Sequence, residues 1–409
     1  MNISILGLGY VGATMFGCLS EMGHRVVGFD PAIHSMDDLL NSRAARSEQQ
    51  LRELIEHGID IGSCIAGNVE TAIRQSDVTF ICVGTPLQPN GGLSDAQVET
   101  VAYQIGKVLR GKPGSHIVVL RSTVMPGTTR AIERIIRTVS GRESPDELGV
   151  AFQPEFLREG SAVADFFRPA LLVFGVSDYE RVAPILESLY LGVEQRPFYL
   201  HPDEAEMLKL ACNAFHALKV SFANEVGAIC NANGINAGDV FDVFVQDLQL
   251  NISPAYLRPG FAYGGPCLPK DLAALAKFGG DLDLPLLRNV SVSNAAQIER
   301  AVRAVAHTNA KRVGIIGGIA HKHGTGDLRG SPALTLATRL LAEGYRVAAY
   351  DDSISRDDCS LCVESFDQLA KQSDVFIRLT RHADEELARV VGKRAVIDLA
   401  PTPEPVRYV

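Results

Sequence analysis

The spacing of apolar residues in the first half of the chain changes repeatedly between that of a strand and that of a helix. Short apolar runs, the form taken by a buried strand, occupy 3–6, 25–29, 78–83, 116–120, 149–152 and 171–176. Stretches of helical periodicity follow them, at 13–22, 96–109 and 128–139. This alternation predicts an α/β domain built on a doubly wound sheet.

The last quarter of the chain repeats the pattern on a smaller scale. Strands are predicted in KRVGIIGG, YRVAAYDD, SDVFIRL and RAVIDL, with a helix at 333–342. Between the two α/β regions a long helix is predicted at 202–232, followed by further helical segments. The expected fold is therefore α/β, with two Rossmann-like doubly wound domains joined by a long central helix and a helical middle domain. We place the domains at 1–200, 201–305 and 306–409.

Polar residues on the central helix predict a functional face. Lys209, Asn213 and His216 have i, i+4 and i+7 spacing, so they project from one side of a largely apolar helix. Such a line is also what a solvated face looks like. We prefer the interpretation that Lys209 and Asn213 point into a cleft and that this helix contributes to a homodimer.

Size and charge limit the classes of function. A chain of 409 residues is longer than one hydrophobic core usually serves, so two or three domains are expected. Its 39 basic and 48 acidic residues give a net charge of -9, which argues against nucleic-acid or anionic-membrane binding. We expect a cytoplasmic protein, because the N-terminus lacks a signal-peptide pattern and no apolar run has the length of a membrane helix.

The first strand is followed by a glycine turn that predicts dinucleotide binding. In GLGYVG, Gly7, Gly9 and Gly12 form the GxGxxG turn, with Tyr10 and Val11 as further expected cofactor-binding residues within it. Such glycines let the backbone approach a pyrophosphate at the helix N-terminus. Asp30 ends the second strand, 18 residues beyond Gly12, where a carboxylate binds ribose hydroxyls and repels a 2′-phosphate. The predicted cofactor is NAD rather than NADP.

Other strand ends carry candidate site residues, because ligands in open α/β sheets bind at the carboxyl ends of strands. Thr85 and Pro86 follow FICV, and Thr123 follows VVLR. FQPEFLREG supplies Glu155 and Glu159 as candidate bases, although either alone is also an ordinary loop charge.

Two further loops suggest chemistry. FAYGGPCLPKDL places Cys267 among glycines and prolines, with Lys270 and Asp271 able to tune the thiol; alone, this is also compatible with a structural cysteine in a turn. IAHKHGTGDLRGSP carries Lys322 and Arg329, which suit a second diphosphate, unless the segment is a solvated linker.

Taken in order, GLGYVG, FICVGTP, RSTVMPGT, PEFLREG, the helix of Lys209 and Asn213, GGPCLPKD and GTGDLRGSP resemble the nucleotide-sugar 6-dehydrogenases over nearly the whole chain. Within that family, VQDLQLNISPAYLRPGFAYGG is more similar to the GDP-mannose branch than to the UDP-glucose branch. The resemblance implies NAD on the first domain, dimer contacts in the middle and the nucleotide sugar on the third.

The resemblance also implies a mechanism. Cys267 would attack the aldehyde formed by a first oxidation, a second oxidation would give a thioester, and water would hydrolyse it. Lys209 and Asn213 would face the oxyanion, and Asp271 would activate the water. Thr123 and Glu155 would assist as water-positioning or acid–base groups.

Binding residues carry over in the same way. The implied cofactor contacts beyond the glycine turn and Asp30 are Thr85, Pro86, Thr123, Lys270 and Arg329. The implied substrate contacts are Glu155, Phe156, Leu157, Lys209, Asn213, His216, Asn224, Tyr256, Arg258, Phe261, Gly264 and Lys322, with Arg258 reaching the partner subunit's site. No metal site is expected.

Several positions depart from the family pattern. Ser35 replaces a lysine after Asp30, SEQQL replaces a proline-glycine segment at Glu48, Gln153 replaces an asparagine, and Gly326 replaces an acid. Pro266 replaces a serine beside Cys267 and removes a backbone N–H that could donate to an oxyanion.

Three alternatives remain open, and the departures motivate the first of them. One is a dehydrogenase of a different nucleotide sugar, such as UDP-glucose. The second is a relative that binds a nucleotide sugar without turnover. The third is a two-electron hydroxyacid dehydrogenase, which needs no cysteine.

Overall fold

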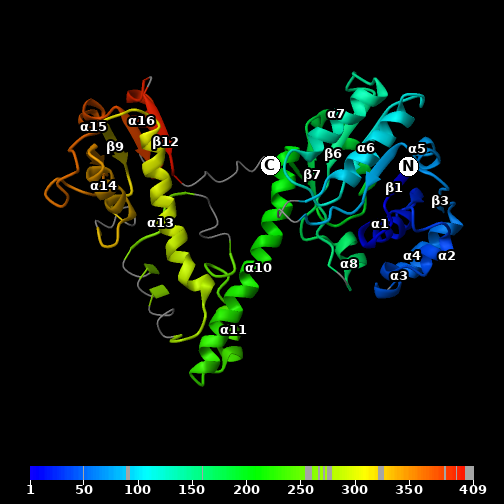
Figure 1. The fold of residues 1–409 in the computed structure, drawn as a ribbon, viewed down its shortest axis with the longest axis horizontal. Helices are drawn as coiled ribbons and strands as arrows, with labels where there is room; N and C mark the ends of the chain where they lie inside the picture. Colours follow the sequence, from blue (N-terminus) through cyan, green and yellow to red (C-terminus); the bar gives the residue numbers. More distant parts are fainter. Residues whose placement is uncertain are drawn as a thin grey trace. The chain divides into compact units, whose positions relative to one another are not determined.

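The computed structural model describes residues 1–48, 50–88, 93–158, 160–253, 260–265, 268–269, 272–273, 279–320, 327–381, 384–392 and 394–400. The chain divides into two compact units, Met1–His216 and Ala217–Val409. Each unit contains a sheet flanked by helices, which confirms the predicted α/β class (Figure 1). Helix α10 (Pro202–Ala232) begins in the first unit and ends in the second.

The first unit is built on an eight-stranded sheet with the order β3-β2-β1-β4-β5-β6-β7-β8. Its strands are β1 (Asn2–Leu6), β2 (Arg25–Phe29), β3 (Cys64–Ile65), β4 (Val78–Ile81), β5 (His116–Leu120), β6 (Leu148–Phe152), β7 (Val173–Val176) and β8 (Phe198–Leu200). Neighbouring strands pair in parallel except β6 and β7, which are antiparallel. The strands predicted at 78–83 and 171–176 are each shorter in the structure. The apolar pattern gave no sign that β7 runs antiparallel to β6.

Helices cover both faces of this sheet, as a doubly wound fold requires. They are α1 (Tyr10–Glu21), α2 (Met36–Leu40), α3 (Arg43–Ser47), α4 (Leu51–Asp60), α5 (Val69–Arg74), α6 (Ala96–Leu109), α7 (Thr128–Ser140), α8 (Ala162–Phe167) and α9 (Tyr179–Leu189). Alternate side chains of each strand enter different cores: Ile5 and Phe80 pack with α1 and α4, whereas Leu6 and Ile81 pack with α5, α6 and α7. Figure 1 shows α6 and α7 packed together on one face.

A series of buried polar side chains connects β1, β4 and β5 in the first sheet. The Ser4 hydroxyl lies 2.7 Å from the Thr79 hydroxyl, which lies 2.7 Å from Nε2 of His116. The Lys112 ammonium donates to Nδ1 of His116 at 3.0 Å. Burial and the neighbouring cation lower the pKa of His116 to about 3, so its ring is neutral at ordinary pH.

The second unit contains a four-stranded parallel sheet with the order β10-β9-β11-β12. Its strands are β9 (Arg312–Ile316), β10 (Arg346–Tyr350), β11 (Val375–Arg378) and β12 (Ala395–Asp398). Its helices after α10 are α11 (Ala237–Phe244), α13 (Pro285–Ala306), α14 (Pro332–Ala342), α15 (Phe366–Gln372) and α16 (Asp384–Val390). The strands predicted in the last quarter of the chain are confirmed.

Candidate functional site

The glycine turn after β1 has the geometry that its sequence requires. Gly7 has a φ of 97°, and a Cβ there would lie 2.7 Å from the carbonyl oxygen of Cys82. A Cβ on Gly12 would lie 1.9 Å from the carbonyl oxygen of Gly7, so helix α1 packs directly against the turn. A Cβ on Gly9 would meet no atom within 4 Å. The open space beside Gly9 is therefore where a ligand approaches the backbone at the N-terminus of α1.

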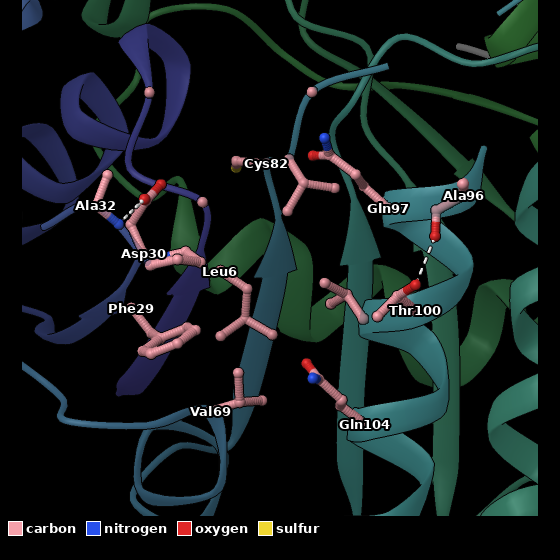
Figure 2. Close-up of a pocket in the computed structure, with 16 residues that line it drawn as sticks. Leu6, Phe29, Asp30, Ala32, Val69, Cys82, Ala96, Gln97, Thr100 and Gln104 are labelled. Carbon is pink, nitrogen blue, oxygen red and sulfur yellow. Dashed lines mark hydrogen bonds between the residues drawn. The ribbon is translucent and has the colours of Figure 1, made fainter. Parts of the chain in front are cut away.

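A pocket of about 760 Å³ opens at this turn, and Figure 2 shows the residues around it. Gly7, Gly9 and Asp30 line one side, together with Leu6, Phe29 and Val69. The other side consists of α6, from which Gln97, Thr100 and Gln104 extend towards the pocket. Sequence reasoning missed this second wall, although the 97, 100 and 104 spacing on a predicted helix was the signal that could have found it.

Asp30 is held in place by the backbone on both sides. Its carboxylate accepts the N–H of Leu8 at 2.8 Å and the N–H of Ala32 at 2.8 Å. Each carboxylate oxygen can accept a further bond, which suits the two hydroxyls of an adenosine ribose. The glycine cradle, the apolar walls at Phe29 and Val69, and this carboxylate together fit the adenosine diphosphate half of NAD.

The other cofactor residues expected in the first unit do not line this pocket. Val11 and Gly12 are within α1, and the Tyr10 hydroxyl donates to the buried carboxylate of Glu48. Thr85 donates to the carbonyl oxygen of Thr123 at 2.6 Å, which ties the two strand ends together. Pro86 is exposed.

Lys209 and Glu155 form a buried ion pair. Nζ of Lys209 lies 2.8 Å from Oε1 of Glu155, and their side chains are 6% and 18% exposed. Oε2 of Glu155 accepts the N–H of Leu157 at 3.0 Å, and Nζ of Lys209 lies 5.4 Å from the centre of the Phe156 ring. The lysine on α10 and the loop after β6 were predicted as separate site elements, and the structure brings them together.

Glu206 anchors α10 one turn before Lys209, and sequence reasoning did not identify it. Its carboxylate accepts the N–H of Gly127 at 2.6 Å, the N–H of Thr129 at 2.7 Å and the Thr129 hydroxyl at 2.5 Å. Burial raises the pKa of Glu206 above its ordinary value, and these hydrogen bonds offset only part of that rise. Glu206 therefore connects α10 to the N-terminus of α7, where Gly127 lies four residues after Thr123.

The remaining predicted residues of α10 are more exposed. Asn213 and His216 are exposed in this chain, whereas Lys209 is buried, so the predicted polar face is not uniform. The side chain of Asn224 lies outside the described residues, as do Glu159, Tyr256, Arg258, Pro266, Cys267, Lys270, Asp271, Lys322 and Gly326.

The part of the cysteine loop that the structure describes packs closely against another backbone segment in the second unit. The N–H of Gly265 donates to the carbonyl oxygen of Gly330 at 3.0 Å, and a Cβ on Gly264 would lie 2.3 Å from that oxygen. Phe261 packs against the core of the unit. Arg329, one residue before Gly330, pairs with Asp327 at 2.7 Å.

Two departures from the family pattern have local structural roles. Ser35 caps the N-terminus of α2, where its hydroxyl accepts the N–H of Asp38 at 3.1 Å. Gln153 is buried, and its side-chain oxygen accepts the Tyr190 hydroxyl at 2.6 Å. Both residues are therefore satisfied within the fold.

Comparison with known sequences assigns the whole chain to one family. Profiles of the UDP-glucose/GDP-mannose dehydrogenase family match 1–193 as its NAD binding domain, 203–296 as its central domain and 315–401 as its UDP binding domain. The chain belongs to the UDP-glucose/GDP-mannose dehydrogenase family. As a member of this family it is an NAD-dependent dehydrogenase of nucleotide sugars. The predicted cofactor is therefore confirmed, and no helix in the described ranges is long and apolar enough to cross a membrane.

Relatives from both branches of the dehydrogenase family are similar to this chain. A GDP-mannose 6-dehydrogenase of Pseudomonas syringae is 40% identical over 98% of this chain and 96% of its own length. A UDP-glucose 6-dehydrogenase of Haloferax volcanii is 33% identical over 97% of this chain and 99% of its own. The solved ternary complex of GDP-mannose dehydrogenase from Pseudomonas aeruginosa has a TM-score of 0.91 at 36% identity, covering 98% of this chain and 96% of that one.

Proposed function

We propose that this dehydrogenase oxidises GDP-mannose to GDP-mannuronate. The observation that carries the proposal is the structural similarity over 98% of the chain to a GDP-mannose dehydrogenase, with a TM-score of 0.91. The UDP-glucose dehydrogenase of Pyrobaculum islandicum, at a comparable 34% identity, has a TM-score of 0.57. The stretch from Val245 to Gly265 supports the same branch.

The conversion of a primary alcohol to an acid removes four electrons from one carbon. When bound, NAD would supply a hydride acceptor, which takes two electrons and one proton in each of two oxidations, so each sugar would consume two NAD and one water. The intermediate is an aldehyde that must stay in the site between the two oxidations. A covalent bond to the protein is the means we infer.

Cys267 is the proposed anchor. Its thiolate adds to C6 of the aldehyde, forming a C–S bond and an oxyanion that takes up a proton. Oxidation of this thiohemiacetal leaves a thioester. Water then adds to the thioester carbon, the C–S bond breaks, and the thiolate returns as the acid is released.

Lys209 and Asn213 are the proposed oxyanion partners. An ammonium group has three N–H donors, and Glu155 accepts one bond from Lys209, so donors remain for a substrate oxygen. Burial of Lys209 strengthens such a bond, because water does not compete with it. Asp271 is proposed to deprotonate the hydrolytic water, and Thr123 and Glu155 to position it.

The substrate is tested by measuring NADH formed per nucleotide sugar consumed. GDP-mannose is expected to give two NADH and to be oxidised in preference to UDP-glucose under matched conditions. Turnover only with a uridine nucleotide would remove the GDP-mannose assignment and leave the mechanism standing. One NADH per sugar would indicate a two-electron enzyme, and none would indicate a binding protein.

The covalent step is tested at Cys267. Cys267→Ala should abolish conversion of alcohol to acid while NAD and nucleotide-sugar binding persist. Cys267→Ser retains a weaker nucleophile whose ester hydrolyses more slowly, so intact-protein mass spectrometry should reveal a sugar adduct. Two NADH per sugar at the normal rate from Cys267→Ala would exclude the covalent route.

We also propose that the protein is a homodimer through its central segment. Helix α11 has no buried residue, and Val243 and Leu248 are 74% and 69% exposed. Apolar side chains exposed to this extent in one segment are typical of an interface. Sedimentation velocity should show a dimer that Val243→Asp with Leu248→Asp converts to monomers. A monomeric unmodified protein would contradict this assignment.

A further inference from the structure

Glu48 is a buried carboxylate that none of the proposed chemical steps uses. It follows α3 and is 4% exposed. In the described part of the chain no lysine, arginine or histidine pairs with it; its charge is met by hydrogen-bond donors instead. Burying a carboxylate without a cation costs desolvation free energy, and the three donors offset that cost. Their convergence on one side chain indicates that Glu48 has a specific role.

These donors come from two different functional segments. Oε1 of Glu48 accepts bonds from the Tyr10 hydroxyl and the N–H of Gly160, and Oε2 accepts the N–H of Ala162 at 2.9 Å. The Tyr10 hydroxyl also lies 3.2 Å from the N–H of Gly160 and 3.4 Å from the carbonyl oxygen of Arg158. Glu48 and Tyr10 thus form one hydrogen-bonded cluster with the backbone of Arg158, Gly160 and Ala162.

Tyr10 belongs to the NAD turn. It directly follows Gly9 and is the first residue of α1, whose N-terminus faces the cofactor pocket. A pyrophosphate bound there would contact the first turn of α1 and so restrain Tyr10. Because the Tyr10 hydroxyl is bonded to Glu48, that restraint reaches the carboxylate.

Gly160 lies in the loop of Glu155, and Ala162 is the first residue of α8, where that loop ends. This loop runs from the end of β6 to the start of α8, and it presents Glu155 to Lys209. Fixing its far end at Gly160 and Ala162 limits where Glu155 and the adjoining Phe156 can lie. Glu48 therefore sits between the residue that follows the NAD turn and the loop that we assign to the substrate.

We propose that Glu48 is a positioning residue that couples NAD binding to nucleotide-sugar binding. The inference rests on the nucleotide-sugar oxidation proposed above. Cofactor at the glycine turn orders the Glu155 loop through Tyr10 and Glu48, so each ligand strengthens the binding of the other. Linkage requires the two effects to be equal in size.

The test measures this coupling without turnover. NADH does not oxidise the alcohol, so its dissociation constant is measured by fluorescence with and without saturating GDP-mannose; if the unmodified enzyme oxidises a different nucleotide sugar, that sugar is used. The ratio of the two constants is the coupling factor. Couplings of this kind are commonly about 5-fold to 150-fold.

Three variants separate coupling from general stability. Glu48→Gln should reduce the coupling factor to within about twofold of unity, and it should raise KM for both ligands more than it lowers kcat. Tyr10→Phe should act in the same direction; it leaves Glu48 its bonds to Gly160 and Ala162, so it serves if Glu48→Gln fails to fold. Asp165→Asn is the matched control, because Asp165 holds the same loop through Arg158 and Ser161 without touching Tyr10.

The outcomes are distinct. Loss of coupling in Glu48→Gln and Tyr10→Phe, with coupling retained in Asp165→Asn, supports the inference. It is overturned if the unmodified protein shows no coupling, if the first two variants keep it, or if Asp165→Asn loses it equally. Failure of GDP-mannose as a substrate changes the ligand used and leaves this test in place.

Discussion

Removal of the Lys209 ammonium should destabilise the first unit through the carboxylate that it leaves behind. Lys209→Met keeps most of the apolar stem but leaves Glu155 with the N–H of Leu157 as its remaining hydrogen-bond donor among the described residues. Breaking a buried ion pair on one side costs about 3–5 kcal/mol. Glu155 is 18% exposed, so we expect the lower end, about 3 kcal/mol.

The double variant provides the control. Glu155→Gln in the Lys209→Met background removes the unpaired charge, so it should recover about 2 kcal/mol of that loss. For a unit the size of Met1–His216, a loss of about 3 kcal/mol corresponds to a fall in Tm of about 6–12 °C. The thermal transition of this unit is identified as the one whose Tm rises when NAD is added.

Activity should separate from stability in the same pair of variants. Lys209→Met should lower kcat by about 10²–10³, because it removes an oxyanion donor. Restoring stability with Glu155→Gln should not restore kcat. The reasoning is refuted if Lys209→Met costs less than about 1 kcal/mol, or if the double variant is no more stable than the single one. Recovery of activity in the double variant would show that Lys209 serves only to neutralise Glu155.

Three further predictions concern the first unit. Asp30→Ala should raise the Kd for NAD and narrow the preference over NADP, because it removes ribose bonds and a repulsive charge; equal binding of both cofactors by the unmodified protein would contradict this. The folded-state pKa of His116, about 3, lies below its unfolded value, so the stability it contributes is complete above about pH 6.5 and is lost as pH falls towards 3. Urea unfolding should show a loss of about 2 kcal/mol from this source between pH 7.5 and 5, which His116→Gln should abolish. Gln50 has a φ of 72°, so Gln50→Gly should relieve about 1 kcal/mol of strain against about 0.5 kcal/mol of added chain entropy, and a fall in Tm would contradict this balance.

Local sequence was sufficient for most of the elements and for the cofactor turn. The periodicity of 202–232 predicts the bounds of α10, and the apolar run at 116–120 predicts those of β5. GLGYVG is recognisable from the sequence alone, and the steric demand on Gly12 arises from Gly7 within the same motif, although the demand on Gly7 comes from the backbone of Cys82 on a neighbouring part of the sheet. Patterns of this kind depend on side chains that are near in sequence, so they are readable without a structure.

Tertiary structure decided which charged residues are buried and what they contact. Glu48 occurs in the polar stretch SEQQL, yet it is 4% exposed, and its hydrogen-bond partners Tyr10 and Gly160 lie 38 residues before it and 112 residues after it. Glu206 depends in the same way on Thr129, 77 residues earlier, and Lys209 on Glu155. The cost of burying a carboxylate is offset only by donors from distant segments, and which donors arrive is set by the packing of the sheet and its helices rather than by the neighbouring sequence.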